Sequence, residues 1–184
     1  MTLYTIGHGT SPVDAFLESL RTFAIVSLVD VRRFPGSRHN PQYGSEALAG
    51  SLAASGIAYR NAVDLGGRRR ANANSENTGL RNEAFRAYAD YMETPEFASA
   101  FETLVNDAET ERTVIMCSET VWWRCHRRLI ADAAVLLKNR AVEHIVAGKG
   151  RPHILTEGAS VWDRHLRYRP CSGSGSPDVR LFDA

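Results

Sequence analysis

Short apolar segments alternate along the chain with longer segments whose apolar residues recur at helical spacing. The apolar segments predict strands over residues 3–6, 25–31, 57–61, 113–116 and 142–147. The periodic segments between them predict helices over residues 12–20, 45–54, 82–92, 95–107 and 123–139. Regular alternation of strand and helix predicts an α/β fold, a single domain with a mostly parallel central sheet and helices on both faces.

Local signals refine this pattern at the ends of the elements. Ser11 stands before Pro12 and is predicted to cap the first helix, with Asp14 in its first turn. Ser45 is predicted to cap the next helix. Residues 64–79 form a polar loop that is long for a compact domain. Residues 170–184 are rich in Pro, Gly and Ser and predict a flexible tail, which leaves residues 1–169 as one domain.

The composition excludes few classes of protein. The chain has 184 residues, of which 43% are hydrophobic and 23% charged, as expected for a globular domain with a full core. Its net charge of +1 provides no strong field, so nucleic acid is not a favoured partner. No apolar run approaches the ~18 residues of a membrane span. Three cysteines without a secretory pattern favour a cytoplasmic protein.

Polar residues cluster where the predicted strands end. Because the carboxyl ends of parallel strands meet at one edge of a sheet, these residues are expected to lie close together and to form a ligand site. They comprise His8, Asp30, Arg32, Arg38, Gly67, Arg68, Cys117 and Glu119, followed by Cys125, His126 and Arg127 at the start of the next helix.

The residue types divide into two predicted roles. Thiol, imidazole and carboxylate groups can act as nucleophile, acid or base, and the candidate catalytic residues are Cys117, Glu119, His126, Asp30 and His8. Guanidinium groups bind phosphate and carboxylate through planar forks, and glycine lets a ligand approach the backbone. The candidate substrate-binding residues are Arg32, Arg38, Gly67, Arg68, Cys125 and Arg127. An anionic small molecule is the suspected ligand.

Metal binding is an open alternative, and neither a metal nor a cofactor is assigned. Cys117 can serve as a nucleophile or as a metal ligand, and Cys125 and His126 could complete a zinc site with it. The spacing is not a standard zinc spacing, and adjacent residues near a helix start diverge by about 100°. The pattern therefore does not require that all three side chains face one point.

Several of these segments together resemble the bacterial and archaeal family called domain of unknown function 488. The resemblance rests on Tyr4–Gly9, Leu28–Arg32, Phe34–Arg38 with Asn40 and Pro41, Leu65–Arg68, and Cys117-x-Glu119 followed by Cys125-His-Arg127. It implies a compact α/β domain with its motifs at one end, and no activity. A weaker similarity to rhodanese-like domains lies in Asp30-x-Arg32 and in a strand that ends at Cys117.

Three functions are compatible with the sequence. The first is an enzyme that acts on an anionic small molecule or nucleotide-like substrate. The second is a nucleic-acid-binding or nucleic-acid-processing protein, which would use the arginines of segment 68–70 on phosphates. The third is a non-catalytic sensor of a metal or ligand.

Overall fold

The computed structural model of the protein describes residues 1–36 and 39–170. Its main sheet has the strand order β3-β2-β4-β1-β5-β6, in which the first five strands are parallel and β6 is antiparallel to β5. The strands are β1 (Leu3–Gly7), β2 (Ser27–Asp30), β3 (Ala58–Asn61), β4 (Thr113–Cys117), β5 (Val142–Val146) and β6 (Lys149–Pro152). The predicted α/β fold with a mostly parallel sheet is confirmed.

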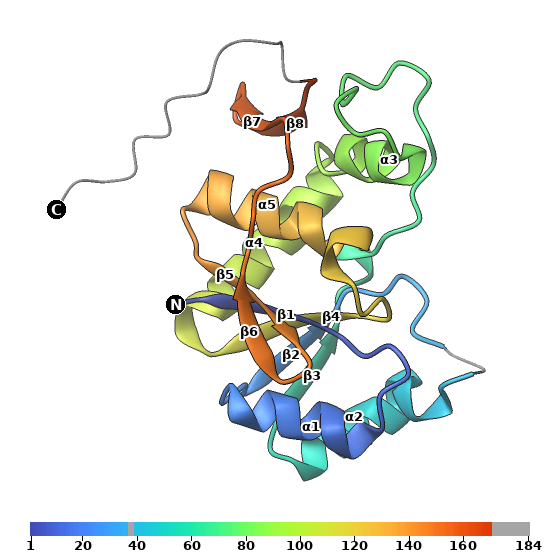
Figure 1. Ribbon diagram of the computed structural model, residues 1–184, viewed down its shortest axis with the longest axis vertical. Helices are drawn as coiled ribbons and strands as arrows, with labels where there is room; N and C mark the ends of the chain where they lie inside the picture. Colours follow the sequence, from blue (N-terminus) through green and yellow to red (C-terminus); the bar gives the residue numbers. More distant parts are fainter. Residues whose placement is uncertain (37–38, 171–184) are drawn as a thin grey trace, which may run out of the picture.

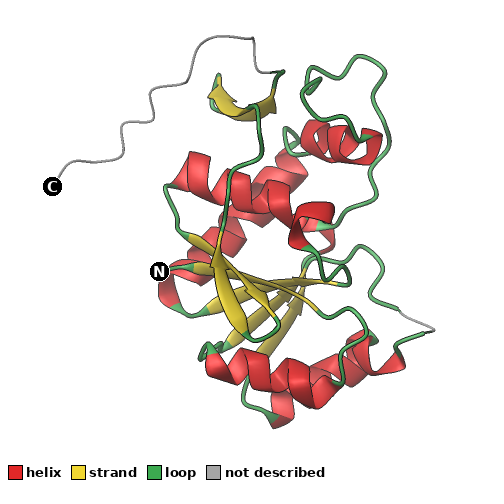
Figure 2. Ribbon diagram, in the orientation of Figure 1, coloured by secondary structure: helices red, strands yellow, loops and turns green. Residues whose placement is uncertain are grey.

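Helices cover both faces of this sheet, as Figures 1 and 2 show. One face carries α1 (Val13–Thr22) and α2 (Ser45–Ala54). The other carries α3 (Glu83–Tyr91), α4 (Pro95–Thr110) and α5 (Arg127–Lys138). None of the helices in the described part of the chain is long and apolar enough to cross a membrane.

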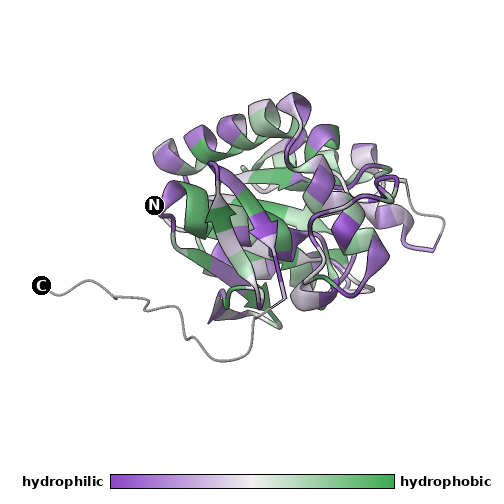
Figure 3. Cartoon of the chain, turned by 90° about the horizontal axis from the view of Figure 1, so that it is seen from above, coloured by the Kyte–Doolittle hydropathy of each residue, from purple (hydrophilic) through white to green (hydrophobic). Residues whose placement is uncertain are grey.

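Successive side chains of a strand point to opposite faces of the main sheet, and each face has its own hydrophobic core. Leu28, Val114 and Met116 pack with the buried face of α1 and with Leu48 and Leu52 of α2. Their neighbours Val29, Ile115 and Cys117 pack with α4 and α5, because successive side chains of a strand point to opposite faces. In Figure 3 the strands are mainly hydrophobic, and hydrophilic positions lie on the outer sides of the helices. Cys117 therefore lies on the α5 face.

The chain connections create a crevice between β1 and β4. These strands are neighbours, but α1 leads from β1 to β2 on one side, while α5 leads from β4 to β5 on the other. Such a switch point leaves room for a ligand beyond the carboxyl ends of the two strands. The pairing continues past the strands, because the backbone N–H groups of His8 and Gly9 donate to the carbonyls of Cys117 and Ser118.

The predicted helix ends need two corrections. The first helix starts at Val13, Pro12 occupies its cap position, and Ser11 does not cap it. The second helix has the predicted bounds, but Gly44 occupies the cap position and Ser45 is its first residue. In both cases the serine side chain makes no capping hydrogen bond. Asp14 lies in the first turn as predicted, near the positive end of the helix dipole.

The predicted helix over residues 123–139 is interrupted. A short 3-10 turn, Trp122–Arg124, is followed by an extended Cys125 with φ −122° and ψ 150°, and α5 then begins at Arg127. The helical spacing of apolar residues from Leu129 onward corresponds to α5, but Trp122 and Trp123 do not belong to this helix. The break matters because it sets the direction of the side chains just before α5.

The sheet does not end at β5 as the sequence analysis expected. Ala147 and Gly148 both have positive φ, which suits the tight hairpin to β6. A small second sheet follows, formed by β7 (Ala159–Trp162) and β8 (His165–Tyr168). The polar short strands 149–152, 159–162 and 165–168 carry little hydrophobic alternation, which is why the pattern missed them.

A buried polar network holds this carboxyl-terminal part to α5. Asp132 is fully buried and accepts hydrogen bonds from the hydroxyls of Thr156 and Tyr168 and, at 2.9 Å, is paired with Nε2 of His153. His153 in turn contacts His144 of β5 over 2.9 Å. Tyr168 is thus part of the core, whereas the predicted tail over residues 170–184 lies, apart from Pro170, outside the described residues.

Candidate functional site at the carboxyl edge of the sheet

A cavity of about 620 Å³ opens at the carboxyl edge, and many of the predicted site residues line it. These are His8, Arg32, Gly67, Arg68, Cys117, Glu119, Cys125 and His126. Asp30 and Arg127 are not in the lining; both are buried behind it. Arg38 lies outside the described residues. The volume falls in the range of about 300–1,000 Å³ that small-molecule sites occupy.

Arg32 is held in place by Asp30. The guanidinium donates from Nε and Nη2 to the two carboxylate oxygens, the shortest contact being 2.6 Å. Tyr59 of β3 donates its hydroxyl to the same carboxylate at 2.9 Å. Burial and the neighbouring Asp30 charge raise the pKa of that hydroxyl, so it remains a donor. The guanidinium of Arg32 is therefore fixed in position before any ligand binds. Only 5% of the residue is exposed.

His8 completes this group from the end of β1. Its Nδ1 lies 2.8 Å from the carbonyl of Gly9, to which it donates, and its Nε2 then accepts from Nη1 of Arg32 at 3.3 Å. The imidazole stacks on Tyr43 with ring centroids 4.0 Å apart. Burial lowers the pKa of His8 to about 4, so the ring is neutral at pH 7. Arg32 thereby has a carboxylate on one side and a neutral imidazole on the other.

The arginines near the edge divide into cavity residues and structural residues. Arg32, Arg33, Arg68 and Arg124 line the cavity, whereas Glu119 is the single carboxylate among its described lining residues. Other arginines are used structurally. Arg69 stacks over the Tyr91 ring at 3.5 Å and donates to backbone carbonyls of its own loop, while Arg128 donates to Thr156. The positive charge in the cavity thus comes from three loops, each following a different strand.

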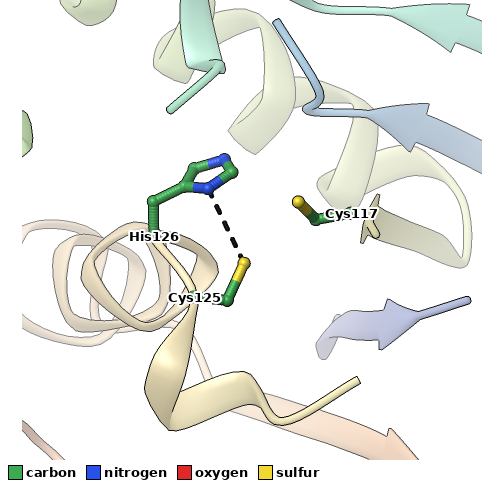
Figure 4. A group of neighbouring side chains, drawn as sticks. All are labelled: Cys117, Cys125 and His126. Atoms are coloured by element: carbon green, nitrogen blue, oxygen red, sulfur yellow. Dashed lines mark hydrogen bonds between the residues drawn. The ribbon is translucent and has the colours of Figure 1, made fainter. Parts of the chain in front are cut away.

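Two thiols and an imidazole converge on one point, as Figure 4 shows, and all three residues line the cavity; we call them the Cys/His group, and the part of the cavity that they line its floor. The Sγ atoms of Cys117 and Cys125 and a ring nitrogen of His126 all lie within 4.8 Å of one another. The Cys125 Sγ is 3.6 Å from His126 Nδ1. Nε2 of the same ring lies 3.0 Å from the Val31 carbonyl and donates to it, which leaves the Nδ1 lone pair facing the sulfur atoms.

The convergence of Cys125 and His126 corrects an expectation from the sequence. Adjacent side chains diverge by about 100° only if both residues are helical. Cys125 is extended, with ψ 150°, and His126 is helical, with ψ −19°. The change of backbone conformation between them turns the two side chains towards the same point. Cys117 reaches that point from β4, on the sheet face that α5 covers.

Arg127 supports the thiol group from behind. Its Nε donates to Cys125 Sγ at 3.4 Å, its Nη1 lies 3.5 Å from Thr5 Oγ1, and its Nη2 donates to the Glu119 carbonyl. A side chain on Gly7 would overlap both that carbonyl and the guanidinium, which explains the glycine at the end of β1. Arg127 is 1% exposed and forms no salt bridge with a carboxylate in the described part of the chain. Its hydrogen-bond partners are thus a thiol sulfur, a hydroxyl and a backbone carbonyl.

The pKa values of the two thiols are shifted in opposite directions. The hydrogen bond from Cys117 lowers the pKa of Cys125, and the Arg127 guanidinium lowers it further, so that it falls to about 6 despite burial. The same hydrogen bond to Cys125, together with burial, raises the pKa of Cys117. Cys125 is therefore the more acidic of the two thiols. The structure contains no disulfide between them.

Aromatic residues near the site were not predicted. Phe34, Phe85 and Tyr88 line the cavity, and Phe34 is 64% exposed there. Phe85 and Tyr88 come from α3 at a spacing of three residues, which in the sequence is indistinguishable from an ordinary buried helix face. Trp122, whose role the sequence left open, stacks on His144 with centroids 4.0 Å apart and is not in the cavity lining.

The fold and this cavity define the chain as an α/β protein with a Cys/His/Arg site at the switch point of its sheet. It belongs to the family described as domain of unknown function DUF488, whose model matches residues 12–134. The match includes every candidate site residue except His8, which precedes it. No curated protein and no solved structure matches the chain. Its function therefore has to be argued from the site.

Proposed function

We propose that the protein is an enzyme that binds an anionic small molecule in the cavity at the carboxyl edge and acts on it with the Cys/His group on the floor. The observation that carries this proposal is the charge of the lining, where four arginines face a single carboxylate. One of them, Arg32, is preorganised by Asp30 and His8. Charge-assisted hydrogen bonds to such forks contribute roughly 1.5–3 kcal/mol each, so an anion offsets the repulsion between the arginines.

A nucleotide-like ligand fits the remaining features of the cavity. The arginines supply partners for a phosphate, and the exposed ring of Phe34, with Phe85, offers an apolar surface for a planar group. The cavity volume of about 620 Å³ suits a molecule of this size. The net charge of +1 favours a small anion over a long polynucleotide, which needs a broad basic surface.

The chemistry is assigned to groups that border the same space. Cys125 carries the more acidic thiol, His126 presents its Nδ1 lone pair, and Glu119 contributes a carboxylate at the rim. A ligand whose charged group contacts Arg32 and Arg68 would bring its neighbouring atoms above the Cys/His group. Nucleophile, base and anion-binding groups around one cavity are the combination that acyl- or phosphoryl-transfer and hydrolytic reactions require.

The experiment is a thermal stability screen with phosphate, sulfate and nucleoside mono-, di- and triphosphates, each against sodium chloride of equal ionic strength. At least one anion is expected to raise the Tm of the wild type. Arg68→Ala should abolish that rise, because Arg68 lines the cavity. Arg70→Ala is the matched control, since Arg70 is an exposed residue of the same loop outside the lining. Equal responses of the two variants, or no response in the wild type, would refute the proposal.

A further inference from the structure

We propose that Cys117, Cys125 and His126 bind one divalent transition-metal ion of the zinc type, with a fourth coordination position open to the cavity. The inference rests on the proposed function for the ligand and the cavity but assigns the chemistry differently: with an ion bound, the two thiols and the imidazole are ligands, and the ion would supply the electrophile in place of a thiol nucleophile and imidazole base. It is argued from separate observations. These are the spacing of the three donor atoms, the orientation of the imidazole and the charge behind the thiols. Two thiolates and one imidazole form a donor set that suits zinc and is used in catalytic zinc sites with an open position.

The donor spacing fits a tetrahedral ion. Zinc–sulfur bonds of ~2.3 Å and zinc–nitrogen bonds of ~2.0–2.1 Å place sulfur and nitrogen donors roughly 3.6 Å apart. The observed Cys125 Sγ to His126 Nδ1 distance is 3.6 Å. Cys117 lies within 4.8 Å of both atoms, so its thiol needs to move by no more than about 1 Å.

The imidazole is held as a metal-binding histidine is usually held. Ligand histidines donate their second ring N–H to a carbonyl or carboxylate, which fixes both the tautomer and the ring orientation. Here Nε2 of His126 faces the Val31 carbonyl at 3.0 Å, and Tyr88 packs against the ring with centroids 5.0 Å apart. The Nδ1 lone pair is consequently directed towards the two sulfur atoms (Figure 4). A histidine that merely packed in a core would not need this orientation.

The surroundings leave space for an ion on the cavity side. All three donor residues line the cavity. Gly67 lies directly against the His126 ring, and a Cβ at that position would come within 3.0 Å of Nδ1. Any larger residue would therefore enter the space next to the donor atom. The glycine keeps the fourth position accessible to a ligand from the cavity.

The charges explain why such a centre would take an anion. A divalent ion with two thiolates is neutral overall, and the Arg127 guanidinium, which donates to Cys125 at 3.4 Å, leaves the group with one positive charge. The cavity arginines add to this potential. We infer that a phosphate, a carboxylate or a hydroxide occupies the fourth position.

The test uses the full-length chain, purified under reducing conditions and reconstituted with Zn²⁺ or Co²⁺. One metal ion per chain is expected by elemental analysis, and the Co²⁺ form should show the intense visible absorption of tetrahedral cobalt with thiolate ligands. Cys117→Ser, Cys125→Ser and His126→Gln should each lower the metal affinity at least tenfold. Cys171→Ser is the matched control and should bind like the wild type. A wild type that binds no stoichiometric metal, or that shows octahedral cobalt, would overturn the site.

Two further outcomes separate the two proposals. If the metal binds but no anion changes the Tm or the cobalt spectrum, the metal site stands and the proposed function fails. If anions bind and no metal does, the proposed function stands and the metal site fails. A protein that forms a Cys117–Cys125 disulfide readily in air, and that binds no metal once this bond has been reduced under anaerobic conditions, would also overturn the metal site, because it would indicate a redox dithiol pair instead.

Discussion

Arg127 donates its Nε–H to the sulfur of Cys125 over 3.4 Å, and this contact joins a buried guanidinium to the most acidic thiol of the site. The side chain also bridges β1 and the loop after β4 through Thr5 and the Glu119 carbonyl. The sequence predicts Arg127 to be a direct substrate ligand. Its position behind the cavity suggests that it instead fixes the thiol and the loop around it.

Arg127→Lys should weaken the hold of this residue on the Cys125 thiol and on the loop after β4. Lysine keeps the charge but cannot reach three partners with a planar fork, so the free energy of unfolding is expected to fall by about 2–4 kcal/mol. The pKa of Cys125 should rise towards its ordinary value, and alkylation of this thiol at pH 7 should slow. Urea unfolding and mass-resolved alkylation measure the two effects. Arg128→Lys serves as the control, because Arg128 donates to Thr156 and not to a thiol.

Asp30→Asn should release Arg32 from its fixed position. The substitution leaves a buried guanidinium without its ion pair, and such losses typically cost about 3–5 kcal/mol of stability. Any anion-induced rise in Tm should shrink, since Arg32 would no longer be preorganised. Asp64→Asn, at an exposed carboxylate of the next loop, should change neither quantity. If the Asp30 variant keeps the full anion response, Asp30 is not a positioning residue for Arg32.

Gly67→Ala should impair the site with little effect on the fold. The new methyl group would come within 3.0 Å of the His126 ring, so the ring has to shift by a few tenths of an ångström. Metal affinity is expected to fall about tenfold, while the midpoint of urea unfolding of the metal-free protein stays close to that of the wild type. Gly36→Ala is a suitable comparison, because Gly36 also lines the cavity and a Cβ there meets no atom within 4 Å.

The stability of the protein should fall below pH 6.5. Burial lowers the pKa of His8 to about 4 and that of His144 to about 3, whereas both titrate near 6.5 in the unfolded chain. Below pH 6.5 the unfolded state therefore binds more protons than the folded state, and the free energy of unfolding decreases until the folded pKa values are reached. The stability that these two histidines contribute is complete above pH 6.5.

His144→Gln isolates one of these contributions. Between pH 6 and pH 5 the loss of stability should be smaller than in the wild type by about 1 kcal/mol, because one proton fewer is taken up on unfolding. Urea unfolding with a chelator present keeps metal binding out of the comparison. His39→Gln, at an exposed histidine, should leave the wild-type slope unchanged. Equal slopes for all three proteins would mean that folding does not lower the pKa of His144.

The carboxyl-terminal boundary can be tested by truncation. A chain that ends at Pro170 should keep the Tm of the full-length protein, because the described core closes at Tyr168. A chain that ends at Arg164 loses β8 and the Tyr168 hydroxyl that donates to the buried Asp132 at 2.9 Å. That chain should unfold at a clearly lower temperature. A drop in Tm for the chain that ends at Pro170 would show that residues 171–184 contribute to the fold.

The sequence alone determined the α/β class, the parallel strands and the edge at which the site residues meet. Hydrophobic periodicity is a local property, so it fixes the type of each element, and the common direction of parallel strands fixes where their ends lie. His8, Arg32 and Cys117 could be assigned to one cavity from these rules, since each follows the end of a strand. The polar hairpins after Val146 carried no comparable signal.

Only the tertiary structure decided which residues face the cavity and which support it. Asp30 and Arg127 resemble their neighbours in the sequence, yet burial places both behind the lining. Cys125 and His126 converge because one residue is extended and the next is helical, a backbone change set by the turn at Trp122–Arg124 and by the contact of His126 with the Val31 carbonyl. Such directions depend on contacts between residues distant in the chain, which no local pattern encodes.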